Sequence, residues 1–190
     1  MRVEFASGAE RAGMKETTEQ YVSRILGLVG NRTPLKVQAA TPVRLARLIR
    51  GVRAARLKKR PAPGKWSVSD ILSHLADSEI VGGWRLRLIL GANGSPILGF
   101  DQDSWVLALR YSHRDPRESL ETFRALRRAN LAMLARLKPG QWENHGIHSE
   151  RGRETVAHIV RMFAGHDLNH LQQVETIVAA GGKRRKKAAR

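Results

Sequence analysis

Apolar residues recur every three to four positions along four long stretches of this chain, and that spacing constrains the fold more than any other feature. The stretches cover residues 41–59, 67–90, 115–138 and 153–180. No convincing alternating strand and no repeat of solenoid period accompanies them. Helices of this length can each span a small bundle. The pattern therefore predicts an all-α fold built as a four-helix bundle.

Capping and breaking residues set the expected helix ends. Thr41-Pro42 supplies an N-cap and a first-turn proline for the first helix. Ser67 with Asp70 three residues later approximates a capping box at the start of the second. Asp115-Pro116 opens the third. Gly181-Gly182 is expected to end the fourth.

These boundaries predict one domain with an extension at either end. Residues 41–180 hold the bundle, and residues 1–40 carry little pattern beyond a possible short helix at 16–29. We interpret residues 1–40 as a mobile or loosely docked arm and residues 181–190 as a basic tail. A chain of 190 residues is long enough for such a core and its extensions.

The chain contains no cysteine. This removes disulfides, cysteine-ligated zinc, iron–sulfur clusters and a cysteine nucleophile, and any metal must be held by His, Asp, Glu, carbonyl groups or water. No stretch resembles a transmembrane helix or the hydrophobic region of a secretory signal. We therefore expect a cytoplasmic protein without a membrane partner.

Two histidines, His166 and His170, stand four residues apart within the fourth predicted helix. This spacing turns about 40° around the helix axis and rises about 6 Å, so both imidazoles leave from one face and can reach one ion. The same geometry underlies H-E-x-x-H zinc motifs, but Asp-Leu-Asn separates this pair and the glutamate base is missing. The alternative is a pair of histidines on an ordinary polar helix face.

A third histidine, His74, lies near the start of the second predicted helix. Three histidines from two helices of a bundle make a workable metal site with an open coordination position, which is typical of catalytic zinc. The metal-ligand candidates are therefore His74, His166 and His170. Candidates for orienting them are Asp77, Asp167 and Gln173. Spacing alone places no general base beside the metal.

The formal net charge is +17, from 34 Lys and Arg against 17 Asp and Glu. Much of the excess lies between residues 44 and 60 and in the C-terminal tail. Arginines at three-residue steps drift about 60° per step around a helix, so they wrap around its solvent side. They form either a solvated face or a surface for nucleic acid. The polyanion-binding candidates are Arg44, Arg47, Arg50, Arg53, Lys183, Arg184 and Arg185.

Several motifs in order resemble the DinB-like (YfiT-like) family of metalloenzymes. They are Trp66-Ser67 before a helix, the run from His74 to Glu79, the run from Phe100 to Trp105, and His166-Asp167-x-x-His170-Leu171-x-Gln173. The resemblance covers roughly residues 40–180. It implies an up-down-down-up four-helix bundle, often a homodimer, with a zinc or nickel ion held by His74, His166 and His170. The N-terminal arm, the strong basicity and the tail depart from the usual pattern.

Characterised members of this family are thiol-dependent transferases or isomerases that use bacillithiol, mycothiol or glutathione. The resemblance therefore implies a metal-dependent S-transferase, or a related hydrolase, acting on a small-molecule substrate with a low-molecular-weight thiol as co-substrate. Arg85 and Arg87 are candidates for holding carboxylates of that thiol. Two alternatives stay open: a basic bundle with weak, non-specific nucleic-acid binding through its tail, and a stress-response or sensor protein with a non-catalytic metal site.

Overall fold

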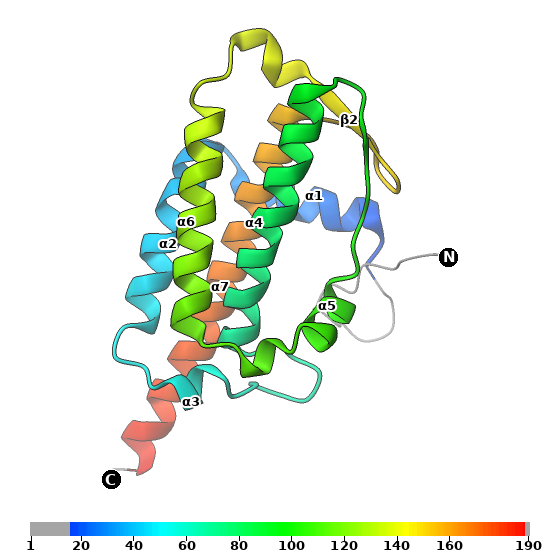
Figure 1. The fold of residues 1–190 in the computed structure, drawn as a ribbon. Coiled ribbons are helices and arrows are strands. Elements are labelled where there is room, and N and C mark those ends of the chain that lie inside the picture. Colours follow the sequence, from blue (N-terminus) through cyan, green and yellow to red (C-terminus); the bar gives the residue numbers. More distant parts are fainter. Residues whose placement is uncertain (1–15, 189–190) are drawn as a thin grey trace.

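Four long helices lie alongside one another in the computed structural model, which describes residues 16–188 and the side chains of residues 16–180 (Figure 1). They are α2 (Pro34–Ile49), α4 (Val68–Gly91), α6 (Pro116–Leu134) and α7 (Val156–Ala188). The colours in Figure 1 show that α2 and α7 run in one direction and that α4 and α6 run in the other. This is the up-down-down-up order, so the predicted four-helix bundle is confirmed.

Shorter elements decorate one side and the two ends of the bundle (Figure 1). They are α1 (Thr18–Val29), α3 (Ala54–Leu57), α5 (Gln102–Ala108), the 3-10 turns η1 (Tyr111–His113) and η2 (Pro139–Glu143), and the strands β1 (Pro96–Ile97), β2 (His145–His148) and β3 (Gly152–Thr155). The central strand β2 pairs in parallel with β1 and antiparallel with β3. The expectation of no strand was wrong, because segments of two to four residues are too short to show alternation.

Two predicted helix starts are confirmed at atomic detail. The Ser67 hydroxyl accepts a hydrogen bond from the Asp70 amide, and the Asp70 carboxylate accepts one from the Ser67 amide. The Asp115 carboxylate accepts hydrogen bonds from the amides of Arg117 and Glu118. Each cap satisfies amides that have no partner within the helix.

The predicted first helix needs correction at both ends. It begins at Pro34 rather than at Thr41, and Pro42 lies inside it. Proline cannot donate to the carbonyl four residues earlier, which here belongs to Gln38. The buried Arg127 guanidinium donates to that carbonyl instead, at 2.9 Å, so the interruption leaves no orphaned group. The helix ends at Ile49 rather than near residue 59.

The other helices differ from prediction mainly at their ends. α6 ends at Leu134 instead of residue 138, and α7 begins at Val156 because residues 152–155 form β3. α7 also continues through Gly181-Gly182 to Ala188. Glycine inside a helix costs about 1 kcal/mol relative to alanine, but it keeps its amide donor and does not forbid the helix. The predicted end of the fourth helix at Gly181-Gly182 is therefore wrong, because α7 continues through these two glycines.

The N-terminal extension is docked from residue 18 onward, contrary to the arm interpretation, while residues 1–15 lie outside the described part. Ile25 and Val29 of α1 are fully buried, and α1 packs against α7 and lies crosswise to the long helices (Figure 1). Gly165 of α7 permits this close approach: a Cβ there would lie 2.1 Å from the Ile25 carbonyl oxygen. A backbone contact of this kind requires glycine.

The bundle core consists of two apolar clusters separated by a polar layer. On α4 the clusters are interrupted between Ala76 and Leu86, on α6 between Phe123 and Leu134, and on α7 between Val160 and Leu171. Arg127 lies in this gap and is almost completely buried. Its guanidinium donates to Glu79 of α4 at 2.9 Å and to Asp167 of α7 at 2.9 Å.

This buried arginine keeps its charge. Burial alone would lower the pKa of the Arg127 guanidinium, but Asp167 and Glu79 more than offset that and raise the pKa above its ordinary value. Asn130 adds an amide donor to the Glu79 carboxylate at 3.0 Å. Burying these charges is favourable only because each is paired and hydrogen-bonded. The layer therefore fixes how the helices align at the level of the histidines.

The contact between α1 and α7 gives a direct test. We expect Gly165→Ala to destabilise the metal-free protein by about 1–3 kcal/mol, since the new methyl group must displace backbone. The matched control is Gly27→Ala on α1, where an added Cβ meets nothing within 4 Å. That control should be neutral or stabilising by up to about 1 kcal/mol. Urea unfolding measures both, and equal effects would contradict the docking of α1.

Candidate metal centre

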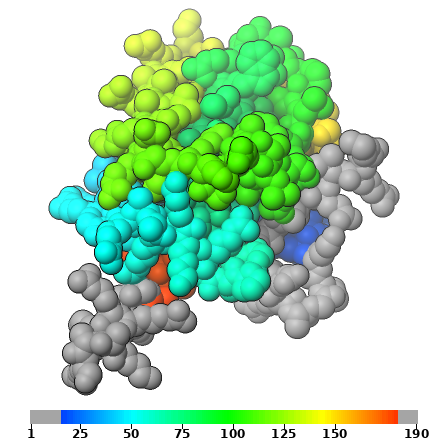
Figure 2. Space-filling view, turned by 60° about the horizontal axis from the view of Figure 1, so that its bottom comes forward, coloured from blue at the N-terminus to red at the C-terminus, as the bar shows by residue number. Residues whose placement is uncertain are grey.

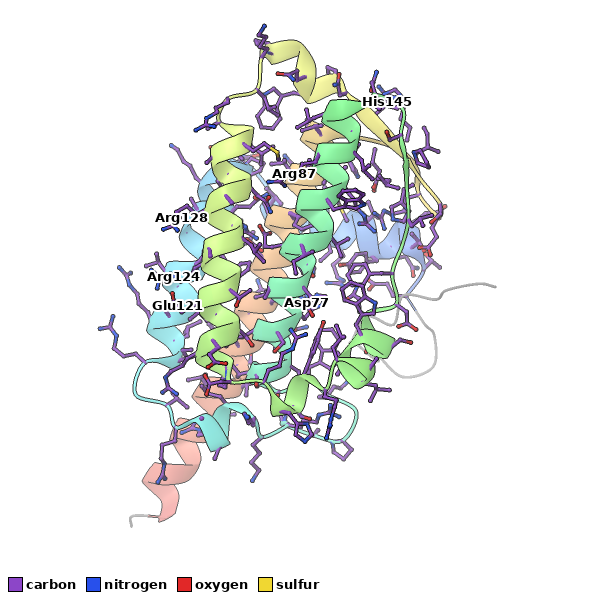
Figure 3. The ribbon with its side chains drawn as sticks, in the orientation of Figure 1. Asp77, Arg87, Glu121, Arg124, Arg128 and His145 are labelled. Carbon is purple, nitrogen blue, oxygen red and sulfur yellow. The ribbon has the colours of Figure 1, made fainter. Side chains whose placement is uncertain are left out.

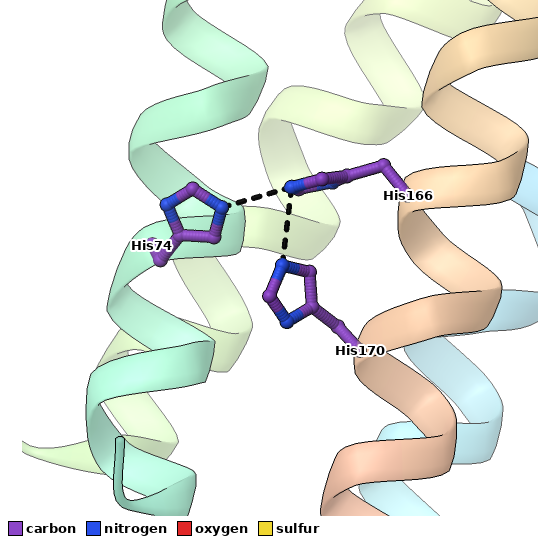
Figure 4. Close-up of side chains that lie close together, drawn as sticks. All are labelled: His74, His166 and His170. Atoms are coloured by element: carbon purple, nitrogen blue, oxygen red, sulfur yellow. Dashed lines mark hydrogen bonds between the residues drawn. The ribbon is translucent and has the colours of Figure 1, made fainter. Parts of the chain in front are cut away.

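Three histidines converge within the bundle, His74 from α4 and His166 and His170 from α7 (Figure 4). The His74 and His166 Nε2 atoms are 2.9 Å apart, and those of His166 and His170 are 3.1 Å apart. One ring nitrogen from each of the three lies within 4.8 Å of the others. The structure therefore brings together the three histidines that the sequence analysis names as metal-ligand candidates.

Burial keeps these imidazoles neutral. It lowers the pKa of His166 to about 4, with the positive charge of Arg127 acting in the same direction. It also places the pKa values of His74 and His170 well below the ordinary value, each with a further contribution from the neighbouring histidines. Neutral imidazole is the form that binds metal ions.

Two side chains orient the His170 ring. Its Nδ1 lies 2.9 Å from Gln173 Oε1, so Nδ1–H donates to the amide oxygen and the Nε2 lone pair faces the other histidines. The Trp66 indole lies parallel to the His170 ring, with 6.1 Å between ring centroids, and 4.9 Å from the His74 ring. Trp66 in turn hydrogen-bonds Asp103 of α5. Gln173 is thus placed as predicted for a residue that orients a ligand.

The donor set fits a divalent transition ion. Three neutral nitrogen donors suit zinc or nickel, whereas calcium and magnesium prefer oxygen. Donors bound at about 2.0–2.1 Å in tetrahedral geometry stand roughly 3.3 Å apart. The His166 Nε2 lies at similar distances, 2.9 and 3.1 Å, from the Nε2 atoms of His74 and His170. Without an ion, three nitrogens facing one another share few protons and repel through their lone pairs. The histidine centre is therefore a candidate three-imidazole metal site.

Two predicted orienting residues have other partners. Asp77 accepts hydrogen bonds from the Tyr111 hydroxyl at 2.7 Å and from Arg114 at 3.1 Å, which fixes η1 against α4 (Figure 3 labels Asp77). Asp167 is engaged by Arg127, not by an imidazole. Adjacent residues on a helix point about 100° apart, so Asp167 beside His166 cannot face the same centre.

The predicted polyanion-binding arginines between residues 44 and 53 are exposed, but they do not lie on a single helix. Arg44 forms an ion pair with Glu175 at 3.0 Å. Arg50 and Arg53 line an open hollow at the turn between α2 and α3, at the end of the molecule that Figure 2 brings forward. The exposed Arg47 stays on the solvent side of α2. The candidates Lys183, Arg184 and Arg185 have side chains outside the described part.

Sequence reasoning missed the buried charges near the histidines. In the sequence, Arg127 and Glu79 look like ordinary charged residues of a helix surface. Each nevertheless stands at a position where an apolar residue would continue the buried apolar stripe of its helix. The candidate Arg85 is buried, whereas Arg87 faces α6 and donates to Asn130 at 2.9 Å. Arg87 is therefore not placed to hold a substrate of the histidine centre.

Within the part of the chain that the structure describes, no helix combines the length and the apolar character that a membrane span requires.

The family model of the DinB superfamily matches residues 39–174. One curated relative, a candidate metal-dependent hydrolase of Oceanobacillus iheyensis, is 29% identical over 115 residues, which is 60% of this chain and 66% of the relative. A second from the same organism is 26% identical over 70% of this chain and 76% of its own length.

A solved structure agrees with the fold. YfiT from Bacillus subtilis, described as a candidate metal-dependent hydrolase with an unusual four-helix bundle topology, superposes with a TM-score of 0.72 at 20% identity. The superposition covers 92% of this chain and 93% of YfiT. The resemblance read from the motifs is thereby confirmed. With its bundle and its three convergent histidines, this chain belongs to the DinB superfamily.

Proposed function

We propose that this protein is a metal-dependent enzyme that transfers a small thiol to an electrophilic substrate, with His74, His166 and His170 as the metal ligands. The observation that supports it is the convergence of three neutral imidazoles, two buried and that of His166 half-buried, at hydrogen-bond distances. A divalent ion held this way deprotonates a bound thiol, or lowers the pKa of bound water, at neutral pH. Three neutral ligands leave the ion's charge uncompensated and a position open for that nucleophile.

The carboxylates favour a thiol over water as the nucleophile. A hydrolase of the H-E-x-x-H kind needs a carboxylate beside the metal as general base. Among the described residues, Asp77 is engaged by Tyr111 and Arg114, while Glu79 and Asp167 are engaged by Arg127. A coordinated thiol needs no such base, because metal binding removes its proton. The same centre with water as nucleophile is the hydrolase alternative.

The protein's own side chains shield the histidine centre from solvent. Trp66 covers the His170 and His74 rings on one side. On α7, α1 packs over the helix, and Arg24 of α1 donates a hydrogen bond to Asn169 at 3.0 Å. Low-dielectric walls of this kind strengthen the interactions that hold a charged nucleophile. Homodimer formation, weak nucleic-acid binding through the basic end and a cytoplasmic location remain predictions.

Metal analysis tests the ligand assignment. We expect about one zinc or nickel ion per chain after loading and dialysis, and loss of nearly all of it in His74→Ala and His170→Ala. Gln173→Leu should weaken binding roughly 10–100-fold, since it removes the partner that orients His170. His145→Ala is the control, because His145 lies at the far end of the bundle (Figure 3). Full occupancy in both ligand variants would refute the centre.

Thiol dependence tests the reaction. The cobalt-loaded protein should gain a thiolate-to-metal absorption band with 2-mercaptoethanol, and His166→Ala should abolish it. Zinc-loaded protein should accelerate displacement of chloride from chlorodinitrobenzene by glutathione, forming a carbon–sulfur bond. Ester hydrolysis that needs the histidines but no thiol, without any thiol transfer, would instead establish the hydrolase alternative.

A further inference from the structure

Arg85 is a buried cation without a carboxylate partner. Its side chain is 8% exposed, and burial, with Arg151 acting in the same direction, lowers its pKa to about 10. The guanidinium donates to the Leu98 carbonyl and lies 5.9 Å from the centre of the Phe100 ring. Within residues 16–180, no carboxylate comes within ion-pair distance of it. A buried guanidinium with so few acceptors has donors to spare.

His148 supplies an unsatisfied donor in the same place. It is 2% exposed, and its Nδ1 accepts a hydrogen bond from the Glu150 amide at 3.1 Å. A neutral imidazole with Nδ1 as acceptor carries its proton on Nε2, and that Nε2 is buried without a partner. Burial lowers the pKa of His148 to about 4, with Arg151 and Arg85 contributing, so the ring is neutral at physiological pH.

Both groups lie where α4 contacts the small sheet, and the charge of Arg85 acts on the His148 ring. His148 of β2 pairs with Ile97 of β1, and Leu98, the next residue, carries the carbonyl that Arg85 contacts. The buried carboxylate nearby, Glu154, is already held by two hydrogen bonds from Arg151, at 2.6 and 3.0 Å. A buried donor that makes no hydrogen bond costs free energy, and a bound acceptor would recover that free energy.

This location lies on the same face of α4 as His74, about three helical turns farther along the helix. His74, Ser78, Gly82 and Arg85 follow one another at steps of four, four and three, which places them on one helix face. Ser78 Oγ lies 3.4 Å from His74 Nε2. A Cβ on Gly82 would lie 2.3 Å from the ring of a phenylalanine of α7.

That phenylalanine, Phe163, lies 6.3 Å from the His166 ring. The loop after α4 makes a second connection: Phe100, against Arg85, packs on Trp105 at 4.7 Å. The route through Phe163 reaches the His166 ring, whereas the route through Phe100 ends at Trp105 of α5.

We propose that Arg85 and His148 form an oxyanion-binding subsite, which holds a carboxylate or phosphate group of a small substrate whose reacting group lies at the histidine centre. The assignment of the reacting group rests on the proposed function; the subsite itself does not. A guanidinium and an Nε2–H side by side can each donate to one oxyanion, a charge-assisted pair of bonds. Such a site would select small organic anions over neutral analogues.

The test uses inorganic phosphate and metal-free, full-length protein, so that phosphate cannot bind through zinc. The imidazole nitrogen resonances of His148 report binding at this place and ignore binding elsewhere on a basic surface. We expect saturable shifts whose dissociation constant rises about 10-fold or more in Arg85→Gln. His148→Gln should raise it several-fold, measured on the Arg85 Nε–H resonance. Arg128→Gln removes the same charge from the exposed face of α6 (Figure 3) and should change nothing.

Absence of a shift in the native protein, or equal affinities in Arg85→Gln and Arg128→Gln, would overturn the subsite. Circular dichroism melting checks each variant, and if Arg85→Gln does not fold, an unchanged affinity in His148→Gln overturns the proposal alone. If the protein binds no metal but still binds phosphate in an Arg85-dependent way, the metal centre is refuted and the subsite stands. If the metal content is normal but phosphate binding does not depend on Arg85, the subsite is refuted and the metal centre stands.

Discussion

The Arg127 guanidinium is the interaction on which the alignment of the bundle depends. From α6 it donates to the Gln38 carbonyl of α2, to Glu79 of α4 and to Asp167 of α7, so that one buried side chain joins all four long helices. It also accounts for Pro42, whose missing amide frees the Gln38 carbonyl. Losing one partner would leave buried charge uncompensated, at a cost of about 3–5 kcal/mol. Such a layer gives a helix bundle one alignment instead of several.

That alignment is what a metal centre of this kind needs. Asp167 is held by Arg127 and directly follows His166, so the ion pair sets the position of α7 against α4 and brings His166 to His74. Apolar contacts alone tolerate small shifts along a bundle, whereas a hydrogen-bonded ion pair does not. The polar layer thus separates two apolar clusters and provides the level at which polar chemistry can be buried.

The elements that sequence predicted well are those fixed by local physics. The helices after Ser67 and Asp115 start where capping side chains satisfy free amides. The errors arose where a distant group supplied what the local sequence lacked: Arg127 compensates for Pro42 inside α2. Likewise, the docking of α1 requires Gly165, which lies far along the chain and looks like a weak helix residue in isolation.

The sequence by itself determined that His166 and His170 share one face of a helix, because four residues make slightly more than one turn. It also determined the bundle, through apolar periodicity, and the nature of the donors, since no cysteine is present. Only the tertiary structure brought His74, which the sequence names as a candidate, beside that pair, and placed the buried Arg85 in the same part of the fold as His148, whose Nε2 has no hydrogen-bond partner. Those groups come from segments far apart in the chain, and their proximity depends on packing and buried ion pairs that no local pattern encodes.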